Sequence, residues 1–320
     1  LLTCFLVYCW SIERLAAAQQ QQPQQQRRRD SSILDSAESQ SFFENLPEGF
    51  HNDVDSITVA VGEHHTCALE YRPGVDFGGP VRCWGRNDWG QAAPSDAIFV
   101  QVSAGHHHTC GIKTDQTVTC WGRMRLAPPG LFQQLSVGGH HTCGLRIEGQ
   151  AFCWGDNISG STSGTPKDTT FVQVVAGRDN SCGLRQNGQV DCWGSNFDGQ
   201  SAPPRDVQFR QLSASSSRHV CGLTLAGNIR CWGRDMRGET QFRTGPWQQV
   251  TTGQWTTCGI RQSDGGIECW GMKKLNESRS AYEEVSSSEY HTCAVDENGE
   301  LECWGKAERA ELVPDGFQAA

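Results

Sequence analysis

Apolar and polar positions follow one pattern seven times between about residue 50 and the end of the 320-residue chain. Each unit opens with a short, β-branched apolar run such as residues 99–103, which is typical of a strand. Two further apolar stretches, residues 109–112 and 118–121, are separated by residues 113–117, a length suited to a hairpin loop. A polar stretch with glycine, glutamine and proline follows, as in residues 86–94, and indicates a turn plus a weak outer strand. The pattern therefore predicts three or four strands in each unit.

The spacing of the units decides how such small sheets can be assembled. The first cysteines of successive units lie 33 to 43 residues apart, and such periods indicate a solenoid, an array or a propeller. A straight solenoid needs atypical polar caps, whereas these seven units look alike. In a radial propeller each small sheet buries its faces against its neighbours. We therefore predict an all-β fold, a seven-bladed β-propeller over residues 45–320.

Fourteen of the sixteen cysteines belong to the repeats, two in each unit. In five units nine residues separate the two cysteines, so that they face each other across a hairpin. Opposed positions in antiparallel strands lie about 4.5 to 5.5 Å apart, within the range that a disulfide bridges. This spacing predicts one disulfide within each blade, namely Cys67–Cys83, Cys110–Cys120, Cys143–Cys153, Cys182–Cys192, Cys221–Cys231, Cys258–Cys269 and Cys293–Cys303.

Two alternatives to disulfides are zinc ligation and free buried thiols. Five histidines stand two residues before a first cysteine, and thiolate with imidazole is a zinc ligand set. The chain contains no Cys-x-x-Cys clip, which argues against zinc. We interpret the recurring histidines as hydrogen-bonded structural residues at the start of the second strand and expect no metal or other cofactor; they are His65, His108, His141, His219 and His291.

Charge and composition narrow the class of function. The formal net charge is -9 without a basic stripe, so a nucleic-acid partner is not expected. The sixteen cysteines favour an oxidising compartment. No apolar run approaches the roughly 20 residues of a membrane-spanning helix, so this segment is not expected to enter a membrane. No nucleophile, phosphate-loop or metalloprotease motif stands apart from the repeats, so we expect no catalytic residue and no enzyme activity.

The first 44 residues differ from the repeats in composition. The apolar run at residues 1–10, followed by alanines 16–18, predicts a signal peptide or its remnant over residues 1–18. Residues 19–44 form a predicted disordered linker that is rich in glutamine and cannot bury enough apolar area to fold. Two N-glycosylation acceptors, Asn157 and Asn276, also fit a secreted protein.

The unit FVQVSAGHHHTCGIKTDQTVTCWG resembles the repeat of the regulator of chromosome condensation family, as do WGRNDWGQ at residues 84–91 and WGSNFDGQ at residues 193–200. The resemblance implies a seven-bladed propeller. Members of that family include a nucleotide exchange factor for a small GTPase, ubiquitin-ligase domains, a secreted bacterial β-lactamase inhibitor and ectodomains of CRINKLY-type plant receptor kinases. The paired cysteines resemble the extracellular, disulfide-rich branch of CRINKLY-type ectodomains more than the nuclear exchange factor.

Positions that are the same in all repeats maintain the unit, whereas an equivalent exposed position that varies among the repeats can serve to recognise a partner. The residue three before each first cysteine lies in the loop between the first two strands, and these loops should share one face. Tryptophan, tyrosine and arginine, which occur there, often anchor protein interfaces. We predict a partner-binding ring of His64, His107, His140, Asp179, Arg218, Trp255 and Tyr290.

The predicted function is a non-catalytic protein, secreted or on the extracellular face of the plasma membrane. We expect this propeller to be a monomer that recognises a protein or peptide through loops on one face. One alternative is an intracellular regulator of the same family, either a guanine-nucleotide exchange factor or a ubiquitin-ligase adaptor. Another is the ectodomain of a truncated receptor kinase.

Overall fold

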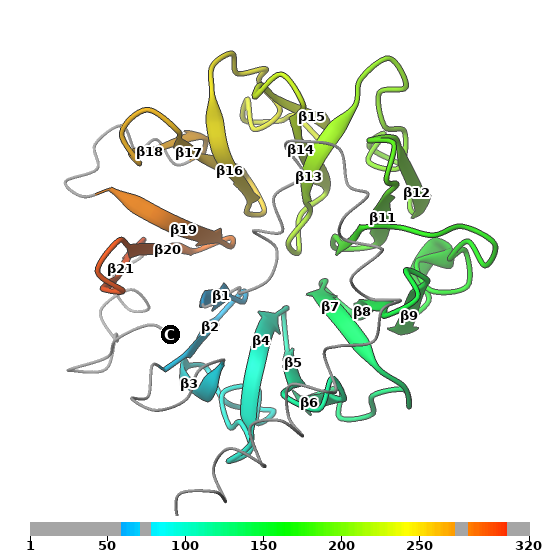
Figure 1. Ribbon diagram of the computed structural model, residues 1–320, viewed down its shortest axis with the longest axis vertical. Helices are drawn as coiled ribbons and strands as arrows, with labels where there is room; N and C mark the ends of the chain where they lie inside the picture. Colours follow the sequence, from blue (N-terminus) through cyan, green and yellow to red (C-terminus); the bar gives the residue numbers. More distant parts are fainter. Residues whose placement is uncertain (1–58, 71–77, 273–280, 306–320) are drawn as a thin grey trace, which may run out of the picture. The chain divides into compact units, whose positions relative to one another are not determined.

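The computed structural model describes residues 59–70, 78–272 and 281–305 (Figure 1). The described residues all belong to one compact unit, His51–Ala320. The predicted signal segment, the glutamine-rich linker and the glycosylation acceptor Asn276 lie outside the described residues.

The described part consists of seven antiparallel units of three strands each, which confirms the predicted all-β propeller. Figure 1 shows these blades following one another in chain order. Their strands are β1 (Val59–Val61), β2 (His65–Leu69) and β3 (Gly79–Gly85); β4 (Ile98–Ala104), β5 (His108–Lys113) and β6 (Val118–Gly122); β7 (Phe132–Val137), β8 (His141–Arg146) and β9 (Ala151–Gly155); β10 (Gln173–Ala176), β11 (Asn180–Leu184) and β12 (Val190–Gly194); β13 (Phe209–Ser213), β14 (His219–Thr224) and β15 (Ile229–Gly233); β16 (Trp247–Thr252), β17 (Thr256–Arg261) and β18 (Ile267–Gly271); β19 (Tyr282–Ser287), β20 (His291–Asp296) and β21 (Leu301–Gly305). Blades 1 and 2 are also joined through a short pairing of β3 with β4.

In blades 1 to 5, where the structure describes the polar stretch after the third strand, it forms turns and irregular structure in place of a regular outer strand. In blade 1, the Asn87 side-chain oxygen accepts a hydrogen bond from the Ala92 amide at 2.9 Å. The Gln91 side-chain oxygen accepts another from the Trp89 amide at 2.9 Å. Asparagine and glutamine at these positions satisfy the turn's backbone amides, so the segment gains nothing by pairing as a strand. A short 3-10 helix, η2 (Ile158–Gly160), lies in the corresponding segment of blade 3.

The second and third strands of each blade place the two repeat cysteines opposite each other in register, as in the pairs Cys110↔Cys120 and Cys182↔Cys192. All seven predicted disulfides are present, with Cα atoms 4.0 to 4.1 Å apart. The prediction of one disulfide within each blade is confirmed. Each bridge cross-links a hairpin close to its centre.

The core lies between neighbouring blades. In blade 4, Phe171 and Trp193 pack with ring centroids 6.1 Å apart. This aromatic pair covers Cys143 and Leu145 of blade 3 in one buried cluster. The same arrangement recurs between blades 1 and 2, where Phe99 and Trp121 join the core. Each thin sheet therefore excludes water from its apolar face only when the next blade is in place.

Side chains from one blade also bond to the next blade. A glutamine on the first strand accepts from a backbone amide of the following blade in five places: Gln101 from Leu135 (2.7 Å), Gln134 from Val174 (2.8 Å), Gln173 from Leu212 (2.6 Å), Gln211 from Val250 (3.1 Å) and Gln249 from Val285 (2.7 Å). The glutamine of the apolar opening run is thus an inter-blade connector. The sequence pattern predicted only that it belongs to a strand.

The last described blade packs against the first. Val59 and Val61 of blade 1 share a buried cluster with Cys293 and Val295 of blade 7. The Val61 amide donates to Ser286 Oγ at 3.1 Å. These contacts join residues about 225 positions apart in the chain and close the ring with the same interactions that connect the other blades.

Candidate functional site

The loops between the first and second strands of the blades contact one another in succession around the ring. The Glu63 amide donates to the Gly105 carbonyl of blade 2 at 3.1 Å, and the Arg178 amide donates to the Ser217 carbonyl of blade 5 at 2.8 Å. The residue after each third strand is tied to the same loop, as in the bond from the Arg123 amide to the His107 carbonyl. We call the surface formed by these loops and by the turns after the third strands the loop face.

Glycine makes the close approach between these loops feasible. A Cβ atom on Gly105 would lie 2.2 Å from the Gly138 carbonyl oxygen, and one on Gly138 would lie 2.2 Å from the Gly177 carbonyl oxygen. Any larger residue would push neighbouring blades apart at this point. The glycine at the end of the opening run therefore determines how closely the loops of neighbouring blades approach each other on the loop face.

The seven residues of the predicted partner-binding ring occupy equivalent places on the loop face. All seven are half-buried. The carbonyls of the first six accept a bond from the residue after their own third strand, which places them at the same end of every blade: His64, His107, His140, Asp179, Arg218 and Trp255. Their role in binding stays a prediction.

Turns of one blade cover ring residues of the next blade. Asp198 of blade 4 forms an ion pair with Arg218 at 3.8 Å. The guanidinium of Arg234 in blade 5 lies 3.8 Å from the centroid of a Trp255 ring, a cation–π contact. This covering explains why the ring is only partly exposed, whereas the sequence analysis expected open loop positions.

Aromatic stacking brings together ring residues from different blades. The imidazole of His64 stacks on Tyr290 with centroids 5.0 Å apart, across the junction of blades 1 and 7. The His107 and His140 rings are stacked at 6.5 Å, across the junction of blades 2 and 3. The ring is therefore a partly connected surface and not a set of isolated side chains.

Large apolar side chains are exposed in the turns after the third strands, a feature that was not predicted from the sequence. Within five residues after the tryptophan of the third strand, each of the first six blades exposes one large apolar side chain. These are Trp89, Leu126, Ile158, Phe197, Met236 and Met272, with Phe197 91% and Leu126 84% exposed. We call them the apolar arc. The signal that could have revealed it is the recurrence of one apolar residue inside an otherwise polar turn.

The five histidines that open second strands are structural, as predicted. Each is buried, and its Nε2 bonds to a hydroxyl of the next blade: His65 to Thr109 (2.7 Å), His108 to Thr142 (2.9 Å), His141 to Ser181 (2.7 Å), His219 to Thr257 (2.9 Å) and His291 to Thr66 (2.6 Å).

Burial has a clear electrostatic consequence for these histidines. It lowers the pKa of His65 and His108 to about 3, with smaller contributions from neighbouring histidines. Burial also lowers the pKa of His141 and His219 to about 4. Their rings are neutral at pH 7, so they act as hydrogen-bonding groups and contribute no charge to the interfaces.

The glycosylation acceptor Asn157 lies exposed in the turn of blade 3. Its side-chain oxygen accepts bonds from the amides of Thr162 and Ser163, in the way that Asn87 caps the turn of blade 1. The turn therefore explains the asparagine by itself, and glycosylation there stays a prediction.

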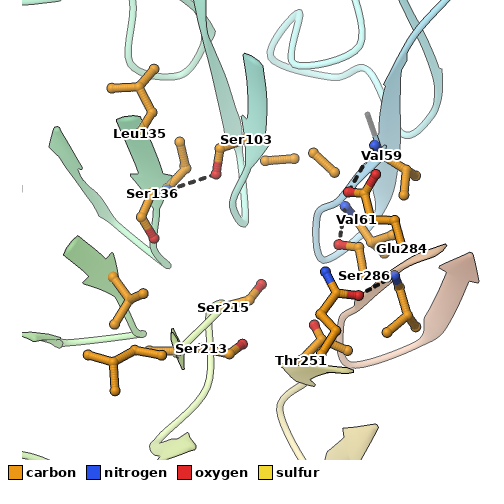
Figure 2. Close-up of a pocket in the computed structure, with 18 of the residues that line it drawn as sticks. Val59, Val61, Ser103, Leu135, Ser136, Ser213, Ser215, Thr251, Glu284 and Ser286 are labelled. Atoms are coloured by element: carbon orange, nitrogen blue, oxygen red, sulfur yellow. Dashed lines mark hydrogen bonds between the residues drawn. The ribbon is translucent and has the colours of Figure 1, made fainter. Parts of the chain in front are cut away.

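A central cavity is lined by first-strand residues from all seven blades. Its volume is about 130 Å³, and its lining is rich in hydroxyl groups such as those of Ser103, Ser136 and Ser286. Figure 2 shows these side chains around the cavity, with the bond from Val61 to Ser286. A drug-sized ligand needs at least about 300 Å³, so this cavity fits a few water molecules and no substrate of that size.

The repeat itself can now be compared with known proteins. The sequence model of the regulator of chromosome condensation (RCC1) repeat matches residues 99–125, 132–161 and 171–200. These segments contain the strands and turns of blades 2, 3 and 4. Blades 2 to 4 of this propeller therefore contain RCC1 repeats. Comparison with curated protein sequences found no significant match.

Solved structures place this RCC1-like propeller beside receptor ectodomains. The CRINKLY WD40 ectodomain of the Arabidopsis thaliana receptor kinase ACR4 aligns with a TM-score of 0.66 and 25% identity, covering 78% of this chain and 97% of that one. The entire ectodomain of the Physcomitrella patens receptor kinase CR4 aligns with a TM-score of 0.63 and 24% identity, covering 77% and 71%. The predicted resemblance to the disulfide-rich receptor-kinase ectodomain branch is confirmed.

The similarity to yeast Prp20p is weaker. Prp20p from Saccharomyces cerevisiae aligns with a TM-score of 0.50 and 18% identity, covering 82% of this chain and 74% of that one. At this identity the likeness concerns the fold alone. Among the described residues of the RCC1-like propeller, no helix has the length and apolar character needed to cross a bilayer.

Proposed function

We propose that the protein is a non-catalytic, extracellular protein-binding propeller that recognises a protein or peptide through the loop face. The observation that carries this proposal is the joint presence of seven intra-blade disulfides and an exposed apolar arc on one face. The first feature favours an oxidising compartment, and the second marks an interaction surface.

The disulfides support the extracellular assignment by their number and regularity. Cytosolic thiols are kept reduced, and structural disulfides in numbers are typical of secreted and cell-surface proteins. The likeness to receptor-kinase ectodomains points to the same compartment. An intracellular regulator of the same family would have to maintain seven bridges against the glutathione pool.

The loop face supports a protein or peptide partner by its chemistry. The apolar arc offers anchors such as Phe197 and Met236, which are 91% and 67% exposed. On the same face, Arg218, Trp255 and Tyr290 add half-buried side chains of the types that dominate interface energies. A face that combines apolar contacts with mixed polar contacts suits a macromolecule better than a small substrate.

The absence of enzyme activity is part of the proposal. The buried histidines are explained by hydrogen bonds between blades, and the central cavity is too small for a drug-sized substrate. The likeness to receptor ectodomains also favours a narrower form of the proposal, in which the propeller is the ligand-binding part of a larger receptor.

Partner capture with matched variants tests the proposal. We would replace two apolar-arc residues together (Phe197→Ala with Met236→Ala) and two ring residues together (Trp255→Ala with Tyr290→Ala) in the full chain. The control replaces Leu131 and Leu225, exposed apolar residues away from the loop face, with alanine. Cross-linking and mass spectrometry on the native source should show a partner bound by the wild type and the control, and lost from either loop-face variant. Equal capture by all forms would exclude the loop face.

Counting thiols in the native protein tests the compartment separately. The extracellular proposal expects no free thiol among the fourteen repeat cysteines under non-reducing conditions. Fourteen free thiols would instead support an intracellular regulator, such as an exchange factor or a ubiquitin-ligase adaptor.

A further inference from the structure

Three histidines that do not serve as inter-blade connectors gather on the loop face between blades 2 and 3. His106 and His107 lie in the loop of blade 2, and His140 lies in the loop of blade 3. One ring nitrogen from each lies within 4.8 Å of the other two. His106 and His140 meet edge to face with centroids 5.1 Å apart.

At least one ring nitrogen of this cluster is left for a ligand. The Nδ1 atom of His107 is buried and has no hydrogen-bond partner. A buried nitrogen without a partner costs free energy unless something binds it, so this atom calls for an explanation. Glu63 Oε2 lies 3.7 Å from His106 Nδ1. A carboxylate on one imidazole nitrogen is the usual way to orient the other nitrogen toward a metal ion.

The site has room to contract around an ion. Zinc–nitrogen bonds of about 2.0 to 2.1 Å in a tetrahedral site place the nitrogens about 3.3 Å apart. Side-chain rotations that move each ring nitrogen by about an ångström would bring the three histidines to this spacing. Gly139 leaves the necessary space, because a Cβ atom there would lie 3.1 Å from His106 Cε1. A cavity of about 210 Å³ adjoins His107 and His140 and is also lined by Met124 and Asp156.

The surrounding charges are mixed. Arg178 lies close enough to disfavour a positive charge on His106, and Arg86 and Arg123 do the same for His107. Glu63 and Asp88 act in the opposite direction. The nearby arginines disfavour an ion that is bound mainly by charge, such as Mg²⁺ or Ca²⁺. An ion that forms directional bonds with imidazole nitrogen, such as Zn²⁺, is favoured by the three histidines.

We propose that His106, His107 and His140 bind one Zn²⁺ ion, with Glu63 as the orienting carboxylate and a fourth coordination position open to the adjoining cavity. Zinc sites with three protein ligands keep this position for water or an exchangeable ligand. The site does not depend on the protein-binding role. These three histidines stand three or four residues before a first cysteine, whereas the histidines weighed as zinc ligands from the sequence stand two residues before it.

Metal titration of the full, oxidised chain tests the proposal. After treatment with a chelator, Zn²⁺ is added and followed by calorimetry, and Co²⁺ is added as a spectroscopic substitute. We expect one equivalent of Zn²⁺ to bind at micromolar concentration or tighter, and Co²⁺ to show the intense visible bands of a tetrahedral nitrogen site. A wild-type chain that binds no zinc in this range would overturn the proposal.

Variants assign the binding to these residues. His107→Gln with His140→Gln should weaken zinc binding at least 100-fold, and Glu63→Gln should weaken it about 10- to 100-fold. The matched control is Arg218→Gln, which changes the equivalent position of blade 5. Binding that survives the double variant, or that Arg218→Gln weakens equally, would contradict the assignment. Circular dichroism and disulfide mapping verify that each variant is folded, and single variants replace the double variant if it is not.

Discussion

At the scale of single residues, the molecule depends on buried polar side chains that bond from one blade to the next. His219 is completely buried, and its Nε2 bonds to Thr257 of the next blade at 2.9 Å. Burial holds its pKa near 4 in place of about 6.5. The ring can keep its hydrogen bond without a charge, and protonation would place an uncompensated charge in the interface.

The pKa of His219 predicts an acid-sensitive interface. Its folded pKa lies below its unfolded pKa, so the unfolded chain binds more protons between about pH 6.5 and pH 4. Stability therefore falls as the pH drops through this window, by up to about 3 kcal/mol at about 1.4 kcal/mol per pH unit, and does not depend on this residue above it. His219→Gln should flatten the pH dependence of urea unfolding measured at pH 7 and pH 4. Parallel pH curves for the two proteins would contradict this expectation.

A second residue-scale prediction concerns the glycines at the loop contacts. Gly105→Ala places a Cβ atom 2.2 Å from the Gly138 carbonyl oxygen and 2.8 Å from a Val137 methyl group. We expect a loss of at least about 3 kcal/mol in the free energy of unfolding. Gly199→Ala is the control, since nothing lies within 4 Å of its Cβ position and only its positive φ of +81° costs energy, about 1 kcal/mol. Equal losses in denaturant unfolding would show that backbone conformation and not contact sets the cost.

At the scale of the element, each strand has two tasks: pairing within its own blade and connecting to the next. The first task was predictable, because the nine-residue spacing of the cysteines determines which positions face each other in the hairpin. The connection to the next blade was not predictable, because a glutamine within an apolar strand is expected to face solvent unless a neighbouring sheet covers it. Gln134, for example, is buried and holds both the amide and the carbonyl of Val174.

Gln173 provides a direct test of this connection. Its side chain accepts from the Leu212 amide at 2.6 Å and donates to the Leu212 carbonyl at 3.1 Å. Gln173→Leu removes both bonds and leaves two backbone groups of the next blade unpaired, which should cost about 2 to 4 kcal/mol. The control, Gln133→Leu, removes a bond from a half-buried glutamine to Arg146 of its own blade and should cost less than about 1 kcal/mol. Urea unfolding with disulfides intact measures both, and similar losses would contradict a special role for the inter-blade glutamine.

At the scale of the whole molecule, the repeat determines the number of blades, while contacts between blades determine the surface. Seven equal units predicted the propeller, and the equivalence of Trp255 with the other ring positions was also readable. Its cover by Arg234 was not, because the covering residue belongs to the turn of the previous blade. The His106 cluster was not readable either, because it arises only when the loops of adjacent blades are brought together. The apolar arc, in contrast, left a signal within each repeat.

Closure of the ring is the property that belongs to the whole molecule alone. Thr66 Oγ1 bonds to His291 Nε2 at 2.6 Å and links blade 1 to blade 7, whereas Thr142 Oγ1 makes the same bond to His108 between blades that are consecutive in the chain. When the second interface opens, a short connection keeps the two blades together. When the first opens, only the six other interfaces hold the ends of the sheet array near each other, so reclosure is slower.

Thr66→Val should therefore loosen the ring more than Thr142→Val, although both remove one buried hydrogen bond. We expect hydrogen–deuterium exchange of the β1 amides to become several-fold faster in Thr66→Val, and exchange of the β7 amides to change less in Thr142→Val. Mass spectrometry with the native disulfides intact measures both strands in one experiment. Equal acceleration at the two interfaces would mean that the closing junction is as well tethered as the others, and that closure depends on more than the contacts between β1 and β19 or β20.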